Sequence, residues 1–352
     1  MRSLQPVFDG HNDALLKLSM AESDPVDLFR DGGPGHVDVP KARAGGMIGG
    51  FFALYSPTPN LPLDFAIFDS PPYDIPLPPP LSRAEADPPV QAQAAIAGQL
   101  EAAGLLRFMR SAADVDAGFD AAMGGGPMAA VLHLEGAECI GPDGEGLDAL
   151  YEAGLRSLGP VWSRPTVFAH GVPFRFPSDG DTGPGLTAEG RALVRACVAR
   201  DMVVDCSHMT LKGFFDVAEE GAALVATHSN ACAISNGARN LTDDQLRAIG
   251  QTGGMVGLNY ATMFLRPDGG RDPAGALDHA VPHLAHMIDM AGENHVGLGS
   301  DFDGAPMPEG LESAVDLPTL VGLMRDAGFG DALIEKLCAG NWRAFLKRTL
   351  GG

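Results

Sequence analysis

Histidine and acidic residues follow short apolar runs at several places in this sequence. The first pair, His11 and Asp13, comes directly after the apolar stretch Pro6-Val7-Phe8. Side chains two residues apart in a strand point to the same side, so this imidazole and this carboxylate are directed at one point. Such a pair supplies half of the ligands of a divalent metal such as zinc. Because a His-x-Asp pair is common, the prediction depends on whether later parts of the chain supply matching groups.

Four further residues of these types end later apolar runs. Glu135 ends the predicted strand 129–135, His208 and His228 follow the runs 202–207 and 223–227, and Asp301 follows 295–300. Each group therefore lies at the carboxyl end of a predicted strand, which is the face where α/β barrel enzymes carry their chemistry. Scattered polar residues would not all fall at that end. We predict that these groups converge on one site.

Three carboxylates and three imidazoles exceed what a single metal ion needs. They suit two ions that share a carboxylate and a bridging hydroxide. The predicted ligands are His11 and Asp13 for one ion, His208 and His228 for the other, and Glu135 between them. Bound metal lowers the pKa of water, so that a nucleophilic hydroxide exists at neutral pH. Glu135 and Asp301 are the predicted catalytic residues, with Asp301 first taking a proton and then returning it to a leaving amine.

The spacing of the apolar runs predicts an α/β fold. Eight strands are predicted at residues 6–12, 49–55, 129–135, 155–162, 202–207, 223–227, 254–259 and 295–300. Helical periodicity predicts helices at 91–110, 187–200, 211–219, 242–249 and 279–291, with a capping box at Thr242 and Gln245. Strands that alternate with helices predict a (β/α)8 TIM barrel of the metal-dependent amidohydrolase type, as a single domain over residues 1–352. Two stacked doubly wound domains are the alternative, although no linker divides the chain.

Two segments interrupt this alternation. Residues 56–90 contain eleven of the 28 prolines, and 164–184 is rich in glycine and proline. An insertion as long as 56–90 is either a lid over the barrel mouth or an arm that contacts another subunit. Residues 316–350 are predicted to form two or three closing helices.

Composition limits the class of protein and its partners. Hydrophobic residues at 45% and charged residues at 20% are typical of a globular protein, and a formal charge of -21 argues against nucleic acid or an anionic membrane surface. There is no run of 18 apolar residues, and the five cysteines lack Cys-x-x-Cys spacing. We expect a cytoplasmic protein with reduced, mostly buried thiols and no membrane anchor.

Several motifs together resemble the membrane (renal) dipeptidase family, peptidase family M19, of the amidohydrolase superfamily. They are Gly10-His11-Asn12-Asp13, Leu134-Glu135-Gly136, Asp205-x-Ser-His208, Thr227-His228-Ser229, Arg239-Asn240 and Gly299-Ser-Asp301-Phe-Asp303-Gly. The resemblance runs from residue 6 to the final helices. It implies a binuclear zinc barrel, often dimeric, that hydrolyses dipeptides and accepts a D-residue at the C-terminal position. It also implies the five ligands above, Asp301 for proton transfer, and Arg239 as the group that binds the substrate carboxylate.

The sequence departs from this family at one position. Mammalian members have a histidine at the end of strand four, where this chain has Trp162. His170, in the following loop, is a candidate substitute, so Trp162 and His170 are predicted substrate-binding residues. The mammalian signal peptide and lipid-anchor tail are also missing, as in the soluble bacterial branch. The alternative substrates are N-acyl amino acids, lactams or other small amides, and the alternative class is a non-catalytic binding protein.

Four other histidines need an interpretation. His279, His283 and His286 recur at helical spacing without an accompanying carboxylate motif, and we interpret them as a solvated helix face. His133 is expected to pack or hydrogen-bond inside the barrel.

Overall fold

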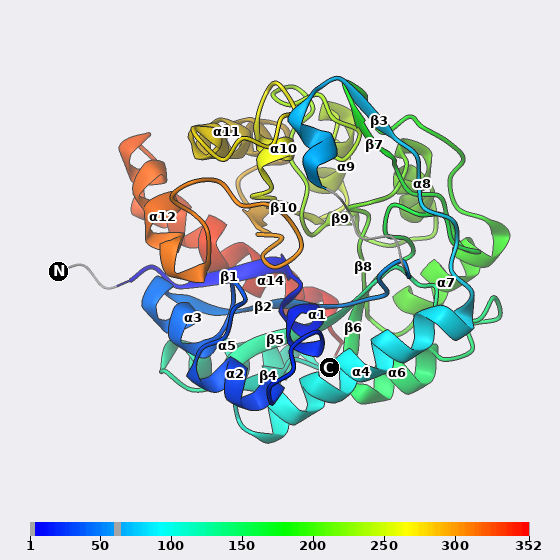
Figure 1. Cartoon of the computed structure of the whole chain (residues 1–352), viewed down its shortest axis with the longest axis horizontal. Coiled ribbons are helices and arrows are strands. Elements are labelled where there is room, and N and C mark those ends of the chain that lie inside the picture. Colours follow the sequence, from blue (N-terminus) through cyan, green and yellow to red (C-terminus); the bar gives the residue numbers. More distant parts are fainter. Residues whose placement is uncertain (1–3, 60–64, 352) are drawn as a thin grey trace.

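A ring of parallel strands forms the centre of the molecule. The computed structural model describes residues 4–59 and 65–351, and its main sheet has the order β8-β6-β5-β2-β1-β11-β10-β9 (Figure 1). These strands are β1 (Val7–Asn12), β2 (Met47–Tyr55), β5 (Met128–Glu135), β6 (Leu155–Gly159), β8 (Val203–Val204), β9 (Val225–Ala226), β10 (Met255–Leu258) and β11 (Val296–Leu298). A parallel bridge between Asp205 and Val225 joins the two ends of this order. The predicted (β/α)8 architecture is confirmed, and each of the eight predicted strands overlaps one of these strands.

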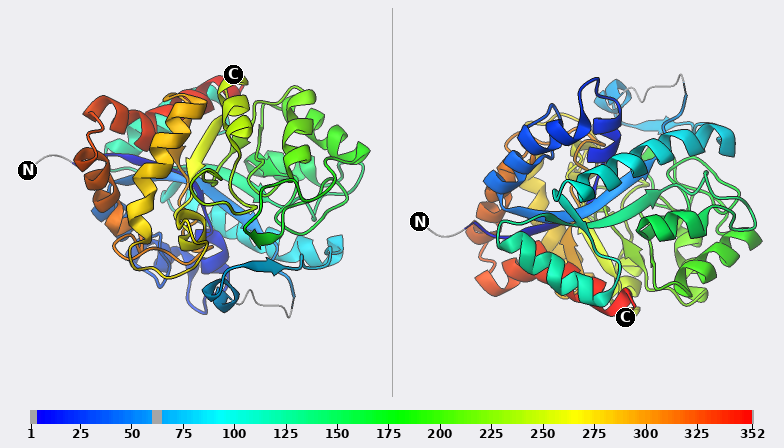
Figure 2. Two further views of the ribbon diagram at one scale, coloured as in Figure 1. Left: turned by 90° about the horizontal axis from the view of Figure 1, so that it is seen from above. Right: turned by 90° about the horizontal axis from the view of Figure 1, so that it is seen from below.

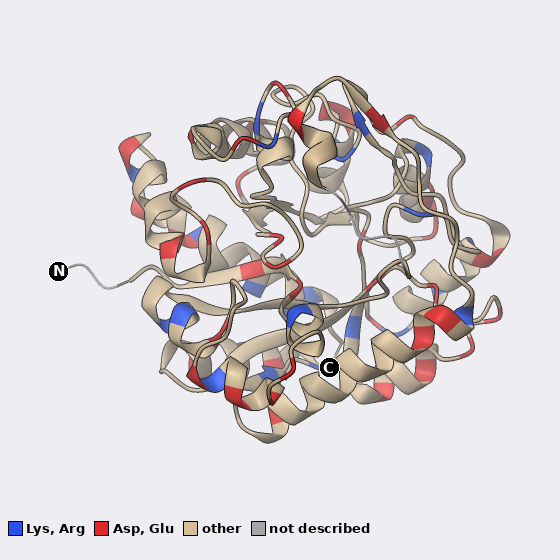
Figure 3. Ribbon diagram, viewed as in Figure 1, with Lys and Arg blue, Asp and Glu red and all other residues tan. Residues whose placement is uncertain are grey.

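Helices cover the outside of the ring, because parallel neighbours need crossover connections. They are α1 (Ala14–Ser19), α2 (Pro25–Asp31), α3 (Val39–Gly45), α4 (Arg83–Ala102), α5 (Ala112–Met123), α6 (Leu147–Ala153), α7 (Ala188–Val198), α8 (Leu211–Glu219), α9 (Asp243–Gln251), α10 (Thr262–Leu265), α11 (Ala280–Ala291), α12 (Leu317–Asp326), α13 (Asp331–Glu335) and α14 (Asn341–Thr349). The capping box at Thr242 is confirmed, since its hydroxyl accepts from the Gln245 amide at 3.3 Å. Acidic and basic residues are interspersed over these helices and loops (Figure 3).

The predicted helix 91–110 is wrong at both ends. Ser82 and Glu85 form a capping box that starts α4 at Arg83, so the last residues of the proline-rich insertion 56–90 are helical. The helix ends before Gly104, whose φ of 70° requires the left-handed region that glycine adopts freely. The chain then enters β4 (Leu106–Phe108), which pairs with β5. Pro88 and Pro89 concealed the helix start, because proline inside a helix is unfavourable.

The two irregular segments pair with each other above the barrel mouth. The insertion contains a short 3-10 helix, η1 (Phe65–Asp69), and strand β3 (Tyr73–Ile75). β3 runs antiparallel to β7 (Phe174–Phe176), which belongs to the second irregular segment. Figure 2 shows this ribbon at one end of the barrel. Residues 60–64 of the insertion lie outside the described residues.

The final helices close the opposite end of the barrel. Trp342 of α14 is fully buried, and its indole N–H donates to the Leu298 carbonyl at 3.0 Å. Its ring lies 5.1 Å from that of Phe51, inside a cluster formed by the first residues of several strands. The helices predicted at 316–350 are confirmed.

Most of the five cysteines are buried, as predicted. Cys139, Cys197, Cys206 and Cys338 are buried and Cys232 is partly buried, all as free thiols. Within residues 4–59 and 65–351, no helix is long and apolar enough to cross a bilayer.

The solvated-face interpretation of the three helical histidines is wrong for His283. This residue is fully buried, and its Nδ1 accepts from the Ala231 amide at 3.1 Å. Its Nε2 lies 3.0 Å from the Leu265 carbonyl, to which it donates. Two backbone groups that would otherwise be buried without partners are thereby satisfied. Burial lowers the pKa of His283 to about 4.

We expect this histidine to make unfolding depend on pH. Between its ordinary pKa of about 6.5 and about 4, the unfolded chain binds a proton that the folded chain excludes. The free energy of unfolding should therefore fall by roughly 2 kcal/mol from pH 7 to pH 5 through this residue alone. Urea titrations of a His283→Gln variant should show a shallower pH dependence than the parent, and His286→Gln on the same helix is the control. Identical pH profiles for parent and His283→Gln would contradict this assignment.

Candidate metal centre and substrate cavity

Glu135 lies among three imidazoles at the mouth of the barrel. Its Oε1 is 3.0 Å from Nε2 of His208, 3.5 Å from Nε2 of His228 and 3.8 Å from Nε2 of His11. His11 Nε2 is also 3.4 Å from Asp13 Oδ2. All five residues are buried at the ends of their strands. The structure thus brings the five predicted ligands together, with the predicted bridging carboxylate at their centre.

Two of the imidazoles are oriented by hydroxyl groups. Ser163 Oγ lies 3.0 Å from Nδ1 of His208, and Thr227 Oγ1 lies 2.8 Å from Nδ1 of His228. These contacts occupy Nδ1 and direct both Nε2 atoms toward Glu135, as in metal sites whose ligands are held from behind. Burial, together with the nearby Arg239, holds the pKa of both histidines well below its usual range. The neutral imidazole is the form of histidine that binds zinc.

The environment of His11 indicates a place for positive charge. Burial lowers the pKa of His11, but the carboxylates of Glu135, Asp13 and Asp301 outweigh burial and raise it to about 10. Neither ring nitrogen has a hydrogen-bond partner among the described residues. Ligand atoms of His11, Glu135 and His228 lie within 4.8 Å of one another, and so do those of His11, Asp13 and Asp301. This set of nitrogen and carboxylate donors fits divalent metal, zinc included.

Two further buried carboxylates hold the strand ends that carry the ligands. Asp205 accepts from the Ser207 and Thr227 amides at 3.1 and 2.9 Å, which ties the end of β8 to the end of β9. Asp9 accepts from the amide and hydroxyl of Ser300 at 2.6 and 2.8 Å, which ties β1 to β11. Burial raises the pKa of Asp9 to about 6. We predicted no role for either residue from the sequence, although Asp9 lies two positions before His11 and Asp205 lies three positions before His208.

Asp301 is held beside the ligands in an unusual backbone conformation. Its φ is 61°, in the left-handed region that few residues other than glycine, asparagine and aspartate adopt. Asn259 donates from Nδ2 to Asp301 Oδ2 at 2.8 Å. Burial raises the pKa of Asp301, while His11 and the Asn259 hydrogen bond oppose that change. A carboxyl with a raised pKa, fixed at one oxygen, is suited to carrying a proton.

Because Gly304 has no side chain, the carboxylates of Asp13 and Asp301 have room beside it. A Cβ atom at this position would lie 2.2 Å from Asp13 Oδ2 and 2.6 Å from Asp301 Oδ1. We expect Gly304→Ala to displace both carboxylates and to lower kcat/KM by about 100-fold or more, since small misplacements of reacting groups are costly. Steady-state kinetics test this, with Gly322→Ala as control because a Cβ at Gly322 meets nothing within 4 Å. Full activity of Gly304→Ala would contradict the role of this close approach.

Arg239 lies against two of the histidine ligands. Its Nη2 is 3.2 Å from His208 Nε2 and donates to the His228 carbonyl at 3.2 Å. Nη1 donates to the Ser207 carbonyl. Its Nε has no partner among the described residues. Burial lowers the pKa of Arg239 to about 10, so the guanidinium stays charged at neutral pH.

A cavity of about 680 Å³ opens above the ligands. Asp13, Glu135, His208 and Asp301 line its polar part. Its walls come from the insertion and from the loops after β6, β10 and β11, and they include Pro57, Phe65, Phe68, Ile75, Trp162, Phe174, Met263, Phe264 and Ala305. The insertion therefore occupies the position that a lid over the mouth would have.

The structure separates Trp162, predicted at the end of strand four, from His170, predicted in the loop that follows. The prediction that this strand reaches residue 162 is wrong, because β6 ends at Gly159 before Pro160, which cannot donate to the ladder. Trp162 lies in the following loop and lines the cavity, with its ring 5.8 Å from that of His208. His170 is not among the residues that line this cavity, and its predicted role stays a prediction.

His133 and Tyr55 lie beside the predicted ligands. His133 is fully buried inside the barrel, with Nδ1 2.8 Å from Ser157 Oγ, as expected for a packing residue. Tyr55 was not predicted as a site residue, yet it ends β2 directly beside Glu135 in the strand register and lines the cavity. Tyr55 could have been predicted as a site residue, because it lies at the end of a strand, as the ligands do.

Comparisons with known proteins agree with this geometry. The sequence model of the membrane dipeptidase family, peptidase family M19, matches residues 1–349. A metallo peptidase from Rhodobacter sphaeroides, solved with a phosphinate mimic of the dipeptide L-Ala-D-Ala, is 46% identical, with a TM-score of 0.94 over 99% of this chain and 100% of that chain. An uncharacterized Klebsiella pneumoniae protein is 45% identical over 260 residues, which are 73% of this chain and 94% of that protein. An uncharacterized dipeptidase of Schizosaccharomyces pombe is 29% identical over 332 residues, which are 90% of this chain and 73% of that protein. These matches over most of the sequence show that the chain belongs to the membrane dipeptidase family, the M19 metallo-dipeptidases.

Proposed function

We propose that this metallo-dipeptidase works with two zinc ions per chain, held by His11, Asp13, Glu135, His208 and His228. The central position of Glu135 among three imidazoles carries the proposal, because one carboxylate within reach of all three can serve two ions. Two bound zinc ions would supply a nucleophilic hydroxide at neutral pH and polarise the peptide carbonyl.

The protein's own groups then position the substrate and move the proton. Asp301, anchored by Asn259, takes a proton from the attacking water and returns it to the leaving amine. Arg239 binds the C-terminal carboxylate through its planar guanidinium, in a buried position where a charged hydrogen bond is strong. The cavity above these groups encloses the rest of the dipeptide and limits access of bulk water.

We further propose that a D-residue is accepted at the C-terminal position. The Rhodobacter sphaeroides relative was solved with a mimic of L-Ala-D-Ala, and the two folds superpose over nearly the whole chain. N-acyl amino acids, lactams and other small amides form the second candidate class, motivated by Trp162 at the expected histidine position.

Hydrolysis of a complete stereochemical panel of dipeptides, L-L, L-D, D-L and D-D, by zinc-reconstituted enzyme tests this function. We expect turnover of the L-L and L-D members, loss of activity after chelation, and recovery with two equivalents of zinc. No turnover of any dipeptide by protein containing two zinc ions would overturn the dipeptide assignment. Turnover of an acylated amino acid or lactam in that case would establish the second class.

A further inference from the structure

The cavity walls beyond the metal ligands form a continuous aromatic surface. The Phe174 ring stacks against Phe264 at 6.4 Å, with an angle of 9° between the ring planes. Phe68 and Trp162 each meet Phe174 edge-on at 5.7 Å. All four line the cavity. Ile75 continues this surface, because it pairs with Phe174 between β3 and β7 and therefore lies on the same face of the ribbon.

Charged groups of the cavity are confined to its metal end. Among the described residues that line it, the charged or titratable side chains besides Tyr55 are Asp13, Glu135, His208, Asp301 and Asp303. The one hydroxyl that the described part of the insertion contributes, on Thr58, already accepts a hydrogen bond from Arg164 at 2.8 Å. A charged substrate side chain placed against the aromatic walls would therefore lose water without gaining a charged partner, which is costly. An apolar side chain gains free energy roughly in proportion to the surface it buries, about 25 cal/mol per Å².

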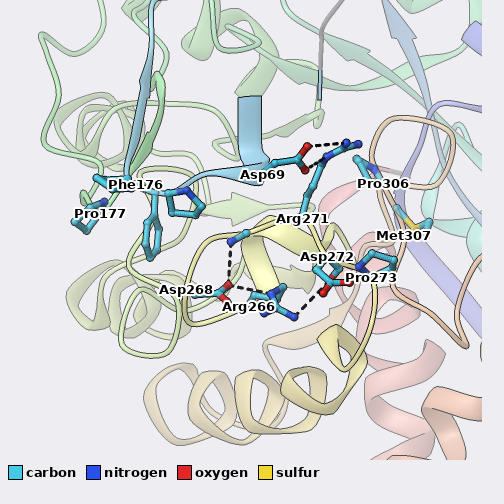
Figure 4. A pocket seen from close by; sticks show the side chains of 13 residues that line it. Asp69, Phe176, Pro177, Arg266, Asp268, Arg271, Asp272, Pro273, Pro306 and Met307 are labelled. Atoms are coloured by element: carbon cyan, nitrogen blue, oxygen red, sulfur yellow. Dashed lines mark hydrogen bonds and ion pairs between the residues drawn. The ribbon is translucent and has the colours of Figure 1, made fainter. Parts of the chain in front are cut away.

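Asp69, a charged residue of the insertion, lies on its other side. Asp69 is paired with Arg271, and Arg266 with Asp268 at 2.6 Å, around an outer groove (Figure 4). The Tyr73 hydroxyl donates to the Gly269 carbonyl at 3.1 Å, which ties β3 to the same loop. The ribbon thus presents paired charges outward and apolar side chains to the cavity. This wall can therefore select a substrate side chain by its shape and polarity.

The position of Arg239 determines which substrate side chain lies against these walls. Its guanidinium carbon lies 5.4 Å from the centre of the Phe264 ring. A C-terminal carboxylate bound by Arg239 therefore places the C-terminal residue next to Phe264 and Phe174. We propose that the site selects dipeptides whose C-terminal residue has a large apolar side chain. This inference rests on the proposed dipeptide function and on Arg239 as the carboxylate-binding group.

Matched dipeptides that differ mainly in charge test this inference. We would compare alanyl-norleucine with alanyl-lysine, and alanyl-methionine with alanyl-glutamate, using the C-terminal configuration that the enzyme prefers. The apolar member of each pair should have a kcat/KM at least about tenfold higher. The same exchanges at the N-terminal residue should have a smaller effect. Equal kcat/KM within each pair, or discrimination at the N-terminal residue alone, would overturn the inference, whereas failure to hydrolyse any dipeptide would contradict the proposed function instead.

A charge placed at the rim of the aromatic wall provides a second test. Ile67 lines the cavity beside Phe68 and is 37% exposed, so a glutamate is accommodated there without burial. Ile67→Glu should raise the ratio of kcat/KM for alanyl-lysine over alanyl-norleucine by about threefold, as for an exposed ion pair. Val315, which is 41% exposed and does not line the cavity, provides the control Val315→Glu. The same ratio in both variants would contradict the placement of the C-terminal side chain.

Discussion

Replacing Asp301 by asparagine is expected to lower kcat by roughly 10²- to 10⁴-fold, the usual contribution of a positioned acid or base. Asparagine has nearly the same shape and tolerates the left-handed conformation at φ 61°, so the backbone should not change. The amide cannot take up the proton that the carboxylate carries in the proposed mechanism. Steady-state kinetics on the preferred dipeptide measure the loss, and elemental analysis of the purified variant shows whether both zinc ions are retained.

The same substitution elsewhere separates this effect from backbone strain. Asp201 also has a positive φ, of 53°, and its side chain is exposed and remote from the cavity. Asp201→Asn should therefore keep the kinetics of the parent. An Asp301→Asn variant with two zinc ions and full activity would show that the proton is carried by another group.

Replacing Glu135 by glutamine is expected to remove most of the bound zinc and, with it, the activity. The substitution keeps the size of the side chain but removes the negative charge within 3.0 to 3.8 Å of three imidazoles. We expect metal affinity to fall by about 100-fold or more, because even residues that only orient a ligand contribute about 10- to 100-fold. Zinc content per chain is the first measurement. The second is the increase in unfolding temperature on adding zinc, which measures binding to the folded state and should be lost in the variant.

Glu145 provides a matched control for this charge change. It is exposed and forms a surface ion pair with Arg83 at 2.7 Å. Glu145→Gln makes the same change in net charge but should bind zinc and hydrolyse dipeptides like the parent, because exposed ion pairs contribute little. If Glu135→Gln also retains two zinc ions and full kcat/KM, Glu135 is not the bridging ligand.

The positions of the predicted ligands could be located from sequence for a simple reason. Parallel strands in a barrel are short and buried on both faces, so each appears as an apolar run that stops where a polar side chain reaches the mouth. Five of the predicted site residues end such apolar runs, and the structure brings them together: His11, Glu135, His208, His228 and Asp301. The capping box at Thr242 could also be predicted from the sequence, because it depends only on residues close together in the chain.

Other features depend on contacts between distant residues, which composition does not show. The helix that begins at Arg83 lies partly in a proline-rich stretch. His283 has the helical spacing typical of a solvated face, although it is buried and hydrogen-bonded to the backbone of Ala231 and Leu265. Six points stay predictions: the two-zinc stoichiometry, the substrate stereochemistry, the role of His170, the single-domain boundaries, the cytoplasmic location and the dimer.

By itself, the sequence determined the barrel, the order of its strands along the chain and the residues at their carboxyl ends, because hydrophobic periodicity and strand length are local properties. Only the tertiary structure decided that Asp9 and Asp205 hold the strand ends and that Tyr55 and Trp162 line the cavity. It also paired β3 with β7, which turned two irregular segments into an apolar wall above the metal centre. The physical reason is that these contacts join residues far apart in the sequence, about 100 residues in the case of β3 and β7. Their free energy comes from burial and hydrogen bonds that exist only once the barrel has closed.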